Sequence, residues 1–146
     1  MTLLRTLLIG LILVVFSLPA YAGELDGKAL KCTLDERELL RGRKSLKDKY
    51  ITFENGFFFF HYVSGTTPLR IEKSYGYRYL PFPHIIKFGI GKATSLNRST
   101  LVLNYWHNPG KMFYLFNCKL IKGENIVIEL EKEIDRIKQT MKNNKI

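Results

Sequence analysis

Hydrophobic and polar positions alternate in short runs over most of this chain. The clearest example is a pair of β-prone runs, residues 50–54 and 57–63, separated by Asn55 and Gly56. An Asn-Gly pair between such runs predicts a β-hairpin with a type I′ turn, because that turn needs positive φ at both central residues. The second run is apolar at odd and even positions alike. We therefore expect cover on both of its faces, from the inside of a curved sheet and from a helix.

Six more runs predict strands, at residues 27–34, 67–73, 74–80, 84–90, 100–106 and 112–121. Short turns separate most of them. The longest interruption is the charged stretch 35–49, which predicts a loop with one helical turn over residues 36–40. Together the runs predict a mainly β fold, an antiparallel up-and-down meander of about eight strands. Closing this meander into a small barrel would remove its exposed edges.

The last part of the chain changes to a helical period. Its apolar residues recur at spacings of three and four, and they are Val127, Leu130, Ile134, Ile137 and Met141. This stripe predicts an amphipathic helix over about residues 125–143, with Asn125 as its N-cap. We expect the stripe to pack on the outside of the barrel; a dimerising coiled coil is the alternative.

The first 22 residues have the pattern of a cleavable signal peptide. Arg5 precedes an apolar stretch at residues 7–18, and Ala20-Tyr21-Ala22 supplies an A-x-A cleavage site before Gly23. Cleavage there would deliver the protein to the periplasm or to the outside of the cell. Residues 23–146 are then expected to form a single domain, long enough to bury its own core.

Cys32 and Cys118 are the only cysteines of the chain. An even pair in an exported protein predicts a disulfide bond, which here would join the first predicted strand to the last. A buried pair of thiols or a pair of metal ligands are the alternatives, and the metal interpretation needs further ligands at a spacing that the sequence does not show.

The chain is strongly basic, with 23 Lys and Arg against 13 Asp and Glu and a formal charge of +10. Cleavage after residue 22 removes Arg5 and no acid, which leaves +9. Such a surface suits an anionic membrane or an acidic protein, and export makes nucleic acid the least expected partner. Solubility alone explains the charge equally well. The candidate contact residues are Arg41, Arg43 and Lys44, for which a solvated loop is the alternative.

The order of the predicted elements resembles the lipocalin-like, or calycin-like, arrangement. The motifs at residues 25–32, 53–56 and 96–101 resemble those of a set of small exported bacterial proteins of unknown function, where similar motifs precede a second cysteine. Lipocalins have Gly-x-Trp in the first strand, whereas this chain has Gly27-Lys28-Ala29. The resemblance implies a barrel and an export route, and no activity.

The resemblance to a lipocalin-like barrel also implies a ligand bound inside the barrel. The alternative function is therefore a carrier of a small apolar or aromatic ligand. Its candidate wall residues are Phe57, Phe59, Tyr75, Tyr77 and Tyr79. The competing interpretation, which we favour, is that the 10 Phe and 8 Tyr of the chain simply fill the interior of an eight-stranded barrel.

Candidate catalytic residues are scarce. His61, His84 and His107 are the only histidines; they lie on or beside three different predicted strands, and no two have the spacing of a metal motif. No nucleophile elbow or phosphate-binding loop is present in the sequence. We therefore expect no metal, no cofactor and no catalysis, but an exported binding or structural module whose basic surface makes its contacts.

Overall fold

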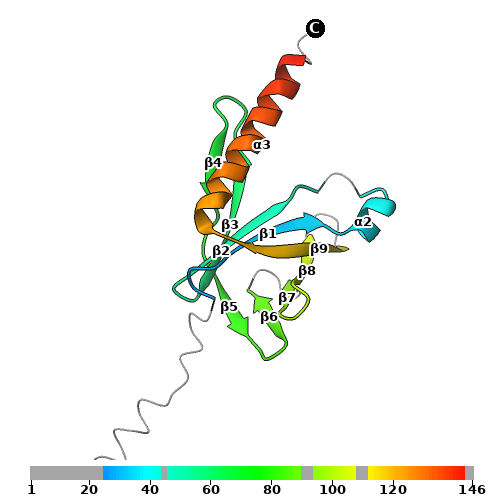
Figure 1. Ribbon diagram of the computed structural model, residues 1–146, viewed down its shortest axis with the longest axis vertical. Helices are drawn as coiled ribbons and strands as arrows, with labels where there is room; N and C mark the ends of the chain where they lie inside the picture. The colour runs from blue at the N-terminus through cyan, green and yellow to red at the C-terminus, as the bar shows by residue number, and fades with distance from the viewer. Residues whose placement is uncertain (1–24, 44–45, 90–93, 108–111, 144–146) are drawn as a thin grey trace, which may run out of the picture.

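The computed structural model describes residues 25–43, 46–89, 94–107 and 112–143, so the predicted signal peptide lies outside the described residues. The elements of the described residues follow one another along the chain (Figure 1). They are β1 (Ala29–Leu34), α2 (Glu36–Leu40), β2 (Lys49–Glu54), β3 (Phe57–Ser64), β4 (Arg70–Lys73), β5 (Tyr77–Pro81), β6 (Ile85–Phe88), β7 (Ser95–Asn97), β8 (Val102–His107), β9 (Met112–Ile121) and α3 (Gly123–Asn143).

The strands form one antiparallel sheet that closes on itself. Its order is β2-β1-β9-β8-β7-β6-β5-β3-β4, and the additional pairing of β2 with β3 closes eight of these strands into a barrel. β4 pairs with β3 alone and is the extra strand. The predicted mainly β meander, closed as a barrel of about eight strands, is therefore confirmed.

The membership of the barrel differs from the prediction at one position. β4 and β5 lie one after the other along the same edge of β3: residues 61–64 of β3 pair with β4, and Phe57 and Phe58 pair with β5. Only β5 continues the barrel to β6, so these two predicted runs supply one strand of the barrel. The eighth position belongs to β7, which the sequence pattern does not predict, because Leu96 is its only buried apolar residue and three residues are too few to show an alternation.

The hairpin of β2 and β3 has the predicted turn. Asn55 has φ 52° and Gly56 has φ 77°, as a type I′ turn requires, and Glu54 is paired with Phe57. Phe58 is fully buried inside the barrel, whereas Tyr50 is buried on the outer face. The expected cover on both faces of β3 is present at Phe58, inside the barrel, and at Val63, which packs on the outer face against the cluster that includes Ile126 and Leu130 of the last helix.

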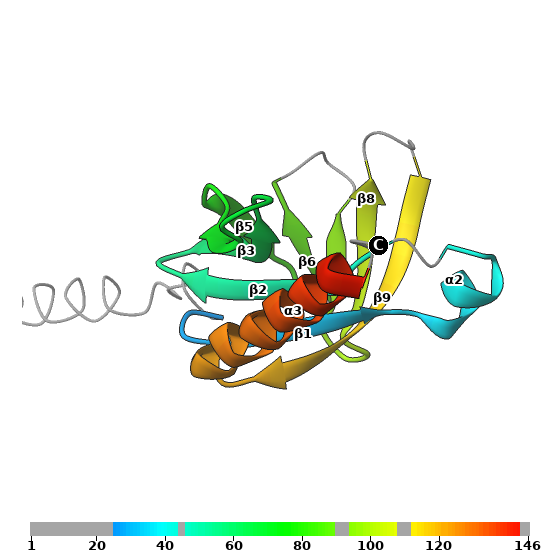
Figure 2. The ribbon, with the colours of Figure 1, turned by 90° about the horizontal axis from the view of Figure 1, so that it is seen from above.

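α3 lies on the outside of the barrel, over β1, β3 and β4 (Figures 1 and 2). Its residues Ile126 and Leu130 are each 1% exposed and pack with Ala29 and Tyr50. The stripe begins one residue earlier than predicted, because Val127 is 48% exposed. The helix starts at Gly123, so Asn125 lies inside the first turn and is not the N-cap.

The predicted disulfide is present. Cys32 of β1 and Cys118 of β9 are direct cross-strand partners, and their sulfur atoms are bonded at 2.04 Å. The bond joins the first and last strands of the barrel.

Candidate functional site

The basic loop predicted as a contact site neutralises a buried acid. Arg43 Nη1 lies 2.6 Å from Glu38 Oε2, and Arg41 Nη1 lies 3.5 Å from Glu38 Oε1. The Glu38 side chain is only 2% exposed, and the Arg43 guanidinium also covers the ring of Tyr114 at 5.0 Å. Lys44 lies outside the described residues. The loop therefore presents less free positive charge than its sequence suggests.

Phe57 and Phe59, two of the five predicted wall residues, lie on the outer face of β3. Phe58 between them belongs to the buried core, and consecutive strand residues point to opposite faces. Cations cover the two outer rings: Lys73 Nζ lies 3.9 Å from the centre of Phe59, and the Arg78 guanidinium lies 5.8 Å from the centre of Phe57. Their predicted place inside the barrel is wrong, because β3 is apolar on both faces and its pattern does not distinguish them.

The three predicted wall tyrosines also separate. Tyr75 precedes β5 and is 88% exposed, so its predicted place in the wall is wrong as well. Tyr77 and Tyr79 do face the interior, where Tyr79 is buried and Tyr77 packs at the margin of the core. The backbone leaves the strand between Lys73 and Tyr77, which ends the alternation that the sequence suggested.

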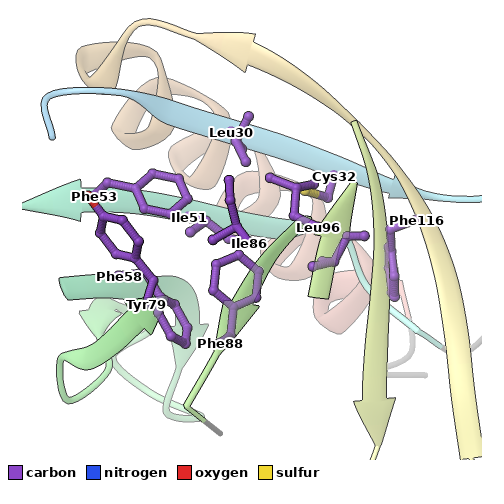
Figure 3. Close-up of a cluster of buried hydrophobic side chains, with 11 residues drawn as sticks. Leu30, Cys32, Ile51, Phe53, Phe58, Tyr79, Ile86, Phe88, Leu96 and Phe116 are labelled. Carbon is purple, nitrogen blue, oxygen red and sulfur yellow. The ribbon is translucent and has the colours of Figure 1, made fainter. Parts of the chain in front are cut away.

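The middle of the barrel is filled with side chains (Figure 3). Each of the eight barrel strands contributes to this core, which comprises Leu30, Cys32, Ile51, Phe53, Phe58, Tyr79, Ile86, Phe88, Leu96, Leu103 and Phe116. Phe58 and Phe88 have ring centres 4.4 Å apart, and Phe53 meets Tyr79 edge to face at 5.4 Å. The favoured interpretation, a barrel filled by its own aromatic residues, therefore holds at its centre.

A pocket of about 400 Å³ remains at the end of the barrel where β2 begins. From inside the barrel it is lined by Lys49, Phe60, Tyr77 and Tyr105, and it continues over the ends of β2 and β3 to α3. We call this the barrel-mouth pocket. A larger hollow, of about 730 Å³, lies on the surface between the second half of α3 and residues 46–48.

Lys49 is the unusual residue of the barrel-mouth pocket. Its Nζ lies 4.8 Å from the centre of the Tyr105 ring and 5.9 Å from that of Phe116. Within the described part of the chain its ammonium group has no ion pair and no hydrogen bond. Burial among the rings lowers the pKa of this amine, and the nearby charge of Lys47 lowers it further. Burial likewise raises the pKa of the Tyr105 hydroxyl.

A second candidate site lies on the outside of β5 and β6, which Figure 1 shows on the side of the barrel away from α3. Leu80 is 58% exposed and directly opposite Lys87. Lys87 Nζ lies 5.2 Å from the ring centre of the exposed Phe82, and Arg78 shares the outer face of β5 with Leu80. We call Arg78, Leu80, Phe82 and Lys87 the β5–β6 patch.

The sequence around the β5–β6 patch has no acidic residue. Between Glu72 and Glu124 the chain contains neither Asp nor Glu, although it contains several lysines and arginines. The acids of the chain lie instead between residues 24 and 72 and in α3. The net positive charge of the sequence is therefore concentrated in residues 73–123, the segment that contains β5 to β9.

The three histidines do not converge. His61 contacts Thr52 Oγ1 at 2.8 Å on the outer face, and burial lowers its pKa together with the charge of Lys73. His107 packs against Tyr105, while His84 is exposed beyond the end of β5. Among the described residues, no group of three or more His, Cys, Asp or Glu could hold a metal ion.

Two further findings bear on the class of protein. In the part of the chain that the structure describes, no helix is both long enough and apolar enough to cross a membrane. Comparison of the chain with protein-family models, with curated proteins and with solved structures gives no match. The barrel architecture therefore stands on the structure alone.

Lys49 and the β5–β6 patch were both missed in the sequence, although each leaves a signal there. Lys49 has the same parity as Ile51 and Phe53, so it is a charged residue in phase with two interior positions. The signal for the β5–β6 patch is the long stretch of sequence without acidic residues. Both signals become informative only when the direction of each strand face is known.

Proposed function

We propose that this protein is an exported, non-catalytic binding module that docks on an anionic membrane surface through the β5–β6 patch. The observation that carries the proposal is the exposure of Leu80 and Phe82 beside Arg78 and Lys87, on strands that contain no acidic residue. Large exposed apolar side chains bordered by cations are typical of an interaction surface.

The chemistry of the patch favours lipid over an acidic protein. Each Lys or Arg close to an anionic leaflet contributes about 1 kcal/mol. Leu80 and Phe82 gain further free energy when they enter the boundary between headgroups and acyl chains. The strands β5 to β9 supply no carboxylate of their own to oppose the approach to a negative surface.

Three features support export. Residues 1–22 have the pattern of a signal peptide. The Cys32–Cys118 bond is typical of an oxidising compartment. The barrel also fits the resemblance, carried by residues 25–32, 53–56 and 96–101, to small exported bacterial proteins with a lipocalin-like arrangement.

The test is cosedimentation with vesicles. We expect binding to vesicles that contain phosphatidylglycerol but not to pure phosphatidylcholine, and a steep loss between low and physiological ionic strength because exposed charges are screened within about 10 Å. The double variant Arg78→Glu/Lys87→Glu should lose most of this binding, and Leu80→Ser/Phe82→Ser should weaken it at every salt concentration.

The matched control is Lys138→Glu/Lys142→Glu, which makes the same change in net charge on exposed positions of α3. It should bind vesicles almost as well as the wild type. Equal losses in the two double variants would show that only net charge matters and would overturn the patch. Salt-sensitive binding to polyglutamate without any binding to vesicles would instead assign the surface to an acidic protein.

A further inference from the structure

We propose that the barrel-mouth pocket binds a small organic anion with an aromatic or apolar body, and that Lys49 pairs with its acidic group. This site is separate from the β5–β6 patch, and the proposal does not depend on contact with a membrane. It names a different class of ligand and a different set of residues.

The first argument is the missing partner of Lys49. In the described residues its ammonium group has only ring contacts, with Tyr105 and Phe116. A charge that is held among apolar groups without a counter-ion is unfavourable, and attraction to a ring face offsets this only in part. An entering anion would complete the pairing, and a charge-assisted hydrogen bond is strong where water is largely excluded.

The acids near the pocket already have partners. Asp48 and Glu133 both contribute to its lining. Asp48 Oδ2 lies 3.9 Å from Lys31 Nζ, and Glu133 Oε1 lies 3.0 Å from Lys47 Nζ. Both acids therefore have their ion-pair contacts with lysines other than Lys49, although Lys31 is paired more closely with Glu129 than with Asp48. Neither acid is the partner of Lys49.

The second argument is the aromatic wall beside Lys49. Tyr105 meets Phe60 and Phe116 edge to face, with ring centres 6.0 Å apart in each pair. Such mutual packing holds the rings in place before a ligand arrives. The Tyr105 hydroxyl is protonated at neutral pH and can donate a hydrogen bond, and burial raises its pKa further above the ordinary value. A rigid apolar wall with a few polar groups is the usual composition of a small-molecule site.

The filled core limits the size of the ligand. The pocket volume of about 400 Å³ is within the range of small-molecule sites. Below the pocket, Phe58 and Phe88 close the interior with ring centres 4.4 Å apart. A long acyl chain therefore has no channel along the barrel axis, and the site suits a compact anion with one or two rings.

Isothermal titration calorimetry with a matched pair of probes tests the inference. The probes are 2-naphthoate and the neutral 2-naphthamide, which differ in charge and hardly in shape. We expect the wild-type protein to bind 2-naphthoate at least about tenfold more tightly. Lys49→Met should remove this preference by weakening naphthoate binding while leaving naphthamide binding unchanged, and Lys49→Arg should retain it.

Lys119→Met is the control, because Lys119 is exposed on the outer face of β9. It should leave both affinities as in the wild type. Lys49→Met should melt no lower than the wild type, since methionine replaces a charge among rings. The proposal is overturned if the wild type binds neither probe, if it binds both equally, or if Lys49→Met binds naphthoate normally. None of these outcomes changes the expected binding to vesicles, so the two proposals fail separately.

Discussion

At the scale of single residues, the structure compensates its buried charges by short-range pairing. Asp35 caps α2 by accepting a hydrogen bond from the Arg37 backbone N–H at 2.9 Å, and its carboxylate also accepts from Arg37 Nε at 2.8 Å and from Asn117 Nδ2 at 3.0 Å. Glu38 is paired with the arginines of the same loop. Lys49 is an exception, because its ammonium group has no ion pair among the described residues, and this is why it suggests a ligand.

Asp35 makes the stability of the fold depend on pH. The hydrogen bonds from Arg37 hold its pKa at about 2, below the ordinary 3.8. A carboxylate whose pKa is lowered by folding stabilises the protein above pH 3.8, and this contribution is lost as the pH falls towards about 2. Asp35→Asn should therefore lower the free energy of unfolding by on the order of 2 kcal/mol at pH 7.

Urea unfolding of the wild type and of Asp35→Asn at pH 7, 4, 3 and 2 measures this difference. It should shrink between pH 4 and pH 2. Asp135→Asn changes an exposed acid of α3 and should alter stability by less than about 0.5 kcal/mol at each pH. A difference between wild type and Asp35→Asn that stays constant with pH would contradict the assignment.

At the scale of elements, α3 is fastened to the barrel mainly along its first half. Ile126 and Leu130 are buried against β1 and β2, and Lys31 Nζ reaches Glu129 Oε2 at 2.5 Å. Towards its end the helix is increasingly exposed, with Met141 at 40%. Tertiary packing of the buried pair therefore stabilises a helix whose second half contributes little to the core.

Two substitutions three residues apart on α3 test this packing. Leu130→Asp would bury an unpaired carboxylate and should lower the free energy of unfolding by at least about 3 kcal/mol. Val127→Asp puts the same group at a position that is 48% exposed, so it should cost less than about 1 kcal/mol. Thermal and urea unfolding compare the two. If both variants unfolded like the wild type, α3 would not be held by these contacts.

At the scale of the whole molecule, closure of the barrel and the disulfide depend on the same pair of strands. β1 and β9 are the first and last barrel strands along the chain, and they are paired over the whole length of β1. The sequence separation of the cysteines is 86 residues, so the bond constrains most of the unfolded chain. Covalent closure and hydrogen-bonded closure therefore stabilise the barrel together.

Removal of the disulfide should thus be costly. The double variant Cys32→Ala/Cys118→Ala should lower the free energy of unfolding by about 2–5 kcal/mol, the loop-entropy model giving about 4.6 kcal/mol. Urea unfolding with and without reductant measures the effect in the wild type, and the same reductant should not change the variant. Mass spectrometry of the folded wild type should show the loss of two hydrogens, and two free thiols there would contradict the bond.

The sequence by itself determined the local elements and the class of fold. Asn55-Gly56 predicts the hairpin turn, because only a few residue types accept positive φ. The helical period over the last residues predicts α3, and the lone pair of cysteines predicts the bond that closes the barrel. The turn and the helix depend on residues that are close together in the chain, and two cysteines can form only one intramolecular disulfide bond. Sequence patterns are therefore sufficient to predict these features.

The tertiary structure alone decided which face of each strand turns inward and which runs supply strands of the barrel. β3 is apolar on both faces, so only its pairing with β2 shows that Phe58 lies inside and that Phe57 and Phe59 lie outside. The same assignment places Lys49 in the barrel mouth, where its ammonium group has no ion pair with a described acid. Both candidate sites follow from contacts between residues far apart in the chain, and a side-chain period of two residues carries no information about which face meets the core.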